Sequence, residues 1–146
     1  MLPTTADRVS HSTSQHVNAE IRRTTEQSVA HYGAAGPAAI ERRLAELDAE
    51  WDVERTLESN ASTLTLVGLT LAATVNRKWL ALPMVVQAFL LQHALQGWCP
   101  PLPILRRLGI RTAEEINRER FALKAIRGDF EGAPSNPERA MEAVQR

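Results

Sequence analysis

The sequence is poor in the residues from which common catalytic and metal sites are built. Cys99 is the only cysteine among 146 residues, which excludes an intrachain disulfide, a zinc cluster and a Cys-x-x-Cys pair. His11 and His16 offer no metal-ligand spacing. The chain also lacks a phosphate-binding glycine loop, a Gly-x-Ser-x-Gly motif and a His-Glu-x-x-His motif. We therefore expect no catalytic residue, cofactor or metal.

The chain also lacks an excess of either charge. It has 17 basic and 17 acidic side chains, whereas a nucleic-acid-binding protein usually carries a basic excess. We therefore expect no nucleic-acid partner. The charges are nevertheless segregated, because residues 59–76 and 79–105 contain no Asp, Glu, Lys or Arg. Only Arg77 and Lys78 separate these two stretches.

The first 60 residues contain no apolar run, so we expect no signal peptide. Residues 1–16 are rich in Ser, Thr and charge, which predicts a disordered tail. Residues 17–59 are expected to form cytoplasmic helices. Their acidic part, 41–58, holds seven acids and three arginines. One apolar stripe with helical spacing accompanies it: Ile40, Leu44, Leu47 and Trp51.

Residues 100–130 are predicted to form a basic helical region. Thr112 begins a capping box that Glu115 completes, and Gly128 is expected to end the helix after Arg127. Seven bases and three acids lie in residues 106–127. We expect this helix to pack on the acidic one through apolar stripes, with charges at the rim. Residues 131–146 are interpreted as a tail or short helix. The stripe of the basic helix is Ile116, Leu123 and Ile126.

Between these flanks, residues 60–99 are predicted to form a transmembrane hairpin with arms at about 61–76 and 79–98. Trp79 and Trp98 are 19 residues apart. At about 1.5 Å per residue this is roughly 28 Å, close to the thickness of the hydrocarbon core. Tryptophan favours both membrane interfaces. The predicted fold class is therefore all-α, a transmembrane helical hairpin flanked by amphipathic cytoplasmic helices.

Small side chains share one face of the first arm, and Gly68-xxx-Ala72 has the spacing that lets helices approach closely in lipid. Two amides of the second arm, four residues apart, are expected to face this groove. The hairpin is thus expected to associate within the chain or between chains. The predicted helix-packing residues are Ala61, Thr65, Gly68, Ala72, Gln92 and Gln96.

A soluble all-helical interaction protein is the competing interpretation. The first arm provides only 16 uncharged positions, fewer than the roughly 20 that a membrane span usually needs. The second arm contains Gln87, Gln92, His93 and Gln96, and polar side chains within a span are costly unless they face a partner.

A short motif closes the hairpin: Gly97-Trp98-Cys99-Pro100, followed by Leu108-Gly109-Ile110. This pattern resembles the YgaP-like inner-membrane family, in which a helical hairpin ends in Gly-aromatic-Cys-Pro and a Leu-Gly-Ile turn follows. The resemblance covers roughly residues 55–112 and implies a bacterial inner-membrane location. Some family members also carry a rhodanese domain. This chain has no room for one, so sulfur transfer is not implied.

Lysine and arginine positions predict that both termini are cytoplasmic, because cytoplasmic flanks of membrane spans carry an excess of these residues. The leading hypothesis is a small non-enzymatic membrane protein that contacts lipid and forms a homo-oligomer or joins a larger membrane complex. A thiol or persulfide carrier using Cys99 is the alternative. Arg106 and Arg107 are the cations expected near that thiol, whereas His93, six residues earlier, is expected to be an interior hydrogen-bonding residue.

Overall fold

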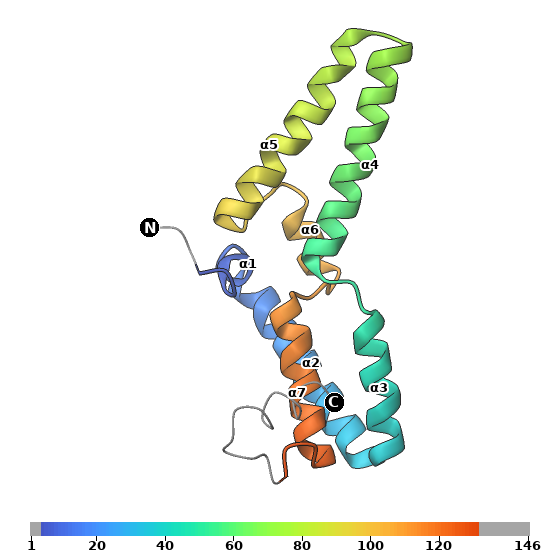
Figure 1. Ribbon diagram of the computed structural model, residues 1–146. Coiled ribbons are helices and arrows are strands. Elements are labelled where there is room, and N and C mark those ends of the chain that lie inside the picture. Colours follow the sequence, from blue (N-terminus) through green and yellow to red (C-terminus); the bar gives the residue numbers. More distant parts are fainter. Residues whose placement is uncertain (1–3, 132–146) are drawn as a thin grey trace, which may run out of the picture. The chain divides into compact units, whose positions relative to one another are not determined.

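The computed structural model describes residues 4–131, and within that range the protein is helical with no strand (Figure 1). The all-α class expected from the sequence is confirmed. The chain divides into two compact units, which we name the hairpin unit (residues 4–21 and 51–114) and the three-helix unit (residues 22–50 and 115–131). The elements are α1 (Arg8–His11), α2 (Gln15–Ala35), α3 (Pro37–Ala49), α4 (Val53–Thr74), the 3-10 helix η1 (Arg77–Leu80), α5 (Ala81–Gln96), α6 (Leu102–Arg107) and α7 (Ala113–Arg127).

The hairpin unit is dominated by α4 and α5, which lie side by side and are joined through η1 (Figure 1). The Asp52 carboxylate accepts a hydrogen bond from the backbone N–H of Arg55, and this N-cap starts α4 well before the uncharged stretch begins. At the turn, the Asn76 side chain accepts a hydrogen bond from the N–H of Lys78. Within residues 4–131, no helix combines the length and apolar character needed to cross a membrane.

A small core closes the open end of the hairpin. Val9, Val53 and Leu57 pack there with Cys99 and Leu102, and all five are buried. The expectation of disorder throughout residues 1–16 is therefore wrong, because α1 contributes Val9 to this core and α2 begins at Gln15. Burial of one apolar residue is not visible in the composition of a polar segment.

Arg106 ties the start of the chain to α6. It is buried, and its guanidinium donates to Thr13 Oγ1 (3.2 Å), Asn18 Oδ1 (3.0 Å) and the carbonyl of Ile110 (3.0 Å). Since a buried cation is costly unless its donors are satisfied, these contacts explain how α6 tolerates it.

The three-helix unit contains a second core, in which the two predicted stripes meet. Ile40, Leu44 and Leu47 of α3 pack with Ile116 and Leu123 of α7. Packing through these stripes is confirmed, but two of the expected members do not belong to the core. Trp51 lies after the end of α3 and is exposed, and Ile126 is also exposed.

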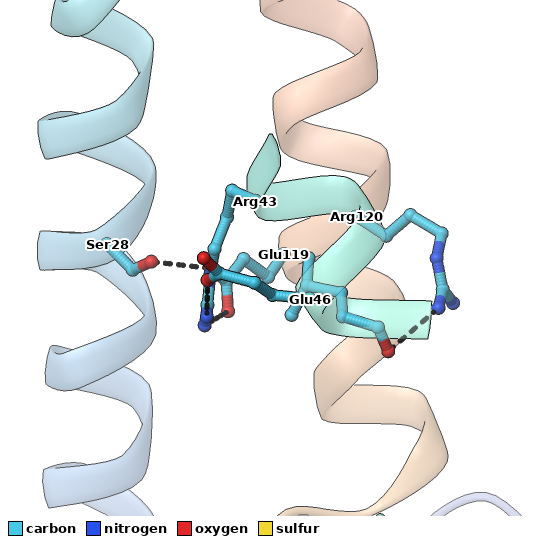
Figure 2. Close-up of polar contacts among 6 residues, drawn as sticks. Ser28, Arg43, Glu46, Glu119 and Arg120 are labelled. Carbon is cyan, nitrogen blue, oxygen red and sulfur yellow. Dashed lines mark hydrogen bonds and ion pairs between the residues drawn. The ribbon is translucent and has the colours of Figure 1, made fainter. Parts of the chain in front are cut away.

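The expectation that charges lie only at the rim of this pair is also wrong. The Glu119 side chain is completely buried, and it accepts hydrogen bonds from Arg43 Nε (2.8 Å) and Ser28 Oγ (2.5 Å) (Figure 2). Arg43 also lies over the ring of Tyr32. One ion pair, between Arg120 and Asp48, does lie at the exposed edge.

The end of α7 follows the predicted signal. The helix ends at Arg127, and Gly128 adopts a φ of +90°, a left-handed conformation that favours glycine. The short helix considered from Asn136 onwards lies outside the described residues.

Candidate functional site

The most unusual surface of the protein is the outside of the hairpin. Among the described residues, thirteen exposed large apolar side chains lie between residues 64 and 98, and only five lie elsewhere. They occur on both arms and at the turn. A soluble helix normally keeps a polar face toward water, and α5 has none. The exposed set is Leu64, Leu66, Val67, Leu69, Val75, Trp79, Leu80, Met84, Val85, Phe89, Leu91, Leu95 and Trp98.

The polar side chains of the hairpin are mostly satisfied within it. Thr63, Thr70 and Thr74 are exposed, yet each hydroxyl donates to the carbonyl four residues earlier in α4. Gln87 of α5 donates its amide N–H to Thr65 Oγ1 of α4 at 2.8 Å. These hydroxyl and amide groups therefore do not depend on water as a partner.

The small face of α4 lies against α5, and Gly68 approaches Leu82 and Pro83 there. Ala61 and Gly68 are buried, and Thr65 and Ala72 are half-buried. A Cβ at Gly68 would lie only 2.5 Å from Pro83 Cδ. On α5, Pro83 and His93 are buried, Gln96 is exposed, and four side chains are half-buried: Leu82, Val86, Leu90 and Gln92.

The two tryptophans lie at opposite ends of the second arm. Trp79 belongs to η1 at the closed end, and Trp98 follows α5 at the open end; both are exposed. Arg77 and Lys78 flank Trp79 at the turn and are exposed too. One tryptophan, with its amphipathic indole ring, at each end of an apolar arm is the arrangement expected of membrane-interface anchors.

At the open end, four side chains form a polar cluster that we name the base cluster: Arg8, Glu54, His93 and Cys99. Arg8 Nη2 donates to Glu54 Oε1 at 2.6 Å, and His93 Nε2 lies 3.1 Å from Glu54 Oε2. The hydrogen bond with His93, together with Arg8, lowers the pKa of Glu54, although partial burial opposes this effect. Glu54 is therefore an ionised acceptor, and His93 Nε2 must be the donor.

The chain reverses after α5 and brings Cys99 back to His93. Gly97 takes a φ of +75°, in the left-handed region, and its N–H bonds the carbonyl of His93 at 2.7 Å. Cys99 is thereby buried close to the imidazole, and no hydrogen bond in the described structure joins the thiol to His93 Nδ1. Six positions separate the two residues in the sequence, and they can approach because α5 ends between them.

The remaining motif residues surround this turn. Trp98 and Pro100 are exposed, whereas Ile110 packs against the core that contains Cys99. Leu108 is exposed, and Gly109 adopts a φ of +82° that ends α6. The motif therefore specifies two chain reversals with left-handed glycines.

The sequence did not reveal Arg8 or Glu54 as members of the cluster. Arg106 was the expected cation near Cys99, but it bonds Thr13 and Asn18 instead. Glu54 looked like one of several exposed acids. Its position in the first turn of α4, three residues from the buried Leu57, is the one local signal that it lies near the core face.

Comparison of the chain with protein-family models, with curated proteins and with solved structures found no match. The resemblance to the YgaP-like family carried by Gly97–Pro100 therefore stays a prediction. Among the described residues, no group of three or more His, Cys, Asp or Glu side chains has a geometry suited to a metal ion.

Proposed function

We propose that the protein is a small, non-enzymatic integral membrane protein of the bacterial inner membrane. In this proposal the α4–α5 hairpin is the anchor, and the helices flanking it are cytoplasmic. The observation that supports it best is the apolar surface that surrounds both arms of the hairpin. The largest exposed apolar patch of a soluble monomer is about 300–600 Å², and thirteen exposed large apolar side chains along one hairpin are unusual for such a protein.

The internal hydrogen bonds of the hairpin support the same proposal. A lipid environment offers no hydrogen-bond partner, so polar groups there must be satisfied by the protein itself. Threonine hydroxyls that bond their own helix, and a glutamine amide that bonds the opposite arm, meet this requirement. The same side chains on a water-exposed helix would have no need of these contacts.

The shortness of α5 sets the geometry of insertion. Its 16 residues correspond to about 24 Å, less than the ~30 Å of an average hydrocarbon core. Bilayers thin locally around short hydrophobic segments at a modest cost. The long side chains of Arg77 and Lys78 at the turn would reach the headgroups beyond the far interface.

The distribution of positive charge supports an orientation with both termini cytoplasmic. Arg55 lies close to the start of the apolar part of α4, and several arginines follow α5. The turn has only Arg77 and Lys78. Because the side with more lysine and arginine stays cytoplasmic, the turn is placed outside. The exposed apolar faces would then be available for self-association or for assembly with a larger membrane complex.

Membrane extraction of two matched variants tests the proposal. Leu66 (65% exposed) lies within the hairpin, and Leu108 (72% exposed) lies outside it. We expect the wild-type protein to stay in the membrane fraction after a carbonate wash. Leu66→Asp should lower the inserted fraction, because an acid at a helix centre costs about 2.5–3.5 kcal/mol on insertion. Leu108→Asp should have little effect.

Release of the wild-type protein by carbonate would refute the proposal. It would favour the soluble interpretation instead, in which a partner protein covers the apolar faces. Equal effects of the two substitutions would also contradict insertion, since neither side chain is buried within the protein.

A further inference from the structure

The base cluster contains buried polar atoms for which the described residues supply no partner. His93 is 1% exposed, and its Nδ1 atom has no hydrogen-bond partner. The Nε atom of Arg8 is also buried and unpartnered. Buried polar atoms are nearly always satisfied in folded proteins. Two exceptions in one cluster, beside the only cysteine of the chain, point to a site for a small polar group.

The orientation of His93 makes its free nitrogen chemically useful. Its Nε2 donates to Glu54, which holds the ring and selects the nitrogen that carries this proton. Nδ1 is then the atom left to exchange a proton with a nearby thiol or with a molecule bound there. A thiol, an imidazole and an orienting carboxylate are the three parts of an activated nucleophile.

We propose that Cys99 is a peroxide-reactive thiol, with His93 as its proton-transfer partner, Glu54 as a positioning residue and a hydroperoxide as the substrate class. The burial of Cys99, which is 3% exposed, favours a molecule as small as hydrogen peroxide over a bulky disulfide.

The chemical step is a two-electron oxidation of the sulfur. Cys99 gives its thiol proton to the imidazole, and the sulfur attacks one peroxide oxygen. An S–O bond forms while the O–O bond breaks, and the departing hydroxide takes the proton from the imidazolium of His93 to become water. The product is a sulfenic acid.

Return to the thiol requires a partner from outside the chain. Because Cys99 is the only cysteine, no intramolecular disulfide can form. All four side chains belong to the hairpin unit, so the site needs no residue of the three-helix unit.

The test measures sulfenic acid formation in the purified full chain. Hydrogen peroxide is added, the product is trapped with dimedone, and the mass increase gives the rate. The reference is a capped peptide of Gly97–Pro100, which has the same local sequence without the cluster. We expect the protein to react at least tenfold faster than the peptide. A smaller ratio, or a slower reaction, overturns the proposal and identifies Cys99 as a packing residue.

A variant then tests the role of His93. His93→Gln should lower the rate at least fivefold, whereas Gln96→Ala, at an exposed position on the same helix, should leave it unchanged. A smaller fall, or a rise, overturns the role of His93, because a side chain that only covers Cys99 would uncover it when replaced. If His93→Gln does not fold, the comparison of the wild-type protein with the peptide still decides the proposal.

Discussion

The buried ion pair of the three-helix unit gives the sharpest prediction about stability. Glu119 is completely buried, and the Arg43 side chain is only 20% exposed. Arg43 donates to Glu119 from Nε at 2.8 Å and from Nη2 at 3.3 Å, and hydrogen bonding to Glu119 raises the pKa of Arg43 above its ordinary value. Arg43→Met would remove the guanidinium that donates to the buried Glu119 carboxylate from two of its nitrogens.

The expected loss of stability depends on the contacts that the Glu119 carboxylate keeps. Removal of one partner of a buried ion pair costs about 3–5 kcal/mol. Ser28 would still donate to Glu119, and partial exposure of Arg43 admits some solvent screening, so we expect roughly 3 kcal/mol, the lower end of that range. The double variant Arg43→Met, Glu119→Leu removes both charges, and its stability should lie within about 1 kcal/mol of the wild type.

Amide hydrogen exchange of α3 and α7, in wild-type and variant proteins, measures these free energies of opening. Arg42→Met is the matched control, because Arg42 is the exposed neighbour of Arg43, and surface changes usually stay within about 0.5 kcal/mol. The reasoning is refuted if Arg43→Met costs less than about 1 kcal/mol, since the pair would then behave like an exposed salt bridge. A double variant less stable than Arg43→Met would also refute it.

Three further predictions concern other contacts. Leu123→Ala should destabilise the three-helix unit by roughly 2–5 kcal/mol, whereas Arg120→Glu, which loses an exposed pair, should cost about 1 kcal/mol or less; a larger effect of Arg120→Glu in amide exchange would mean that electrostatics dominates. Gly68→Leu should separate α4 from α5, because even a Cβ would lie 2.5 Å from Pro83, and unchanged thermal stability in detergent would contradict this contact. Because the pKa of Glu54 is lowered from its ordinary value of 4.5 in the folded protein, its stabilisation is present above that value and is lost as the pH falls through the lower folded pKa. Amide protection factors near the open end of the hairpin, which correct for the intrinsic slowing of exchange at low pH, should therefore fall in acid, and Glu54→Gln should weaken this dependence.

Part of the fold could be predicted from residue spacing. Ile40, Leu44 and Leu47 recur at the helical period, and so do Ile116 and Leu123, which was enough to predict that the two stripes pack together. Trp51 fitted the same period but lies beyond the end of α3. Periodicity alone cannot locate the end of a helix when no glycine or proline marks that end.

The base cluster could not be predicted in the same way. Arg8, Glu54 and Cys99 are far apart in the sequence, and each resembles an ordinary surface or packing residue by itself. Their meeting depends on α1 lying close to Gly97, where an added Cβ would be 2.3 Å from the carbonyl oxygen of Arg8. A close approach of this kind is a tertiary contact, and no local pattern encodes it.

The sequence by itself determined that the protein is all-α, that its uncharged residues form a hairpin, and that two charged helices pack through apolar stripes. These features depend on local propensity and on the period of hydrophobic residues, which act over short distances along the chain. Only the tertiary structure decided that Glu119 is buried, that α5 faces Gly68 with Leu82 and Pro83, and that His93 meets Cys99. The physical reason is that burial and polar pairing depend on which segments cover one another, and segments distant in sequence decide this together.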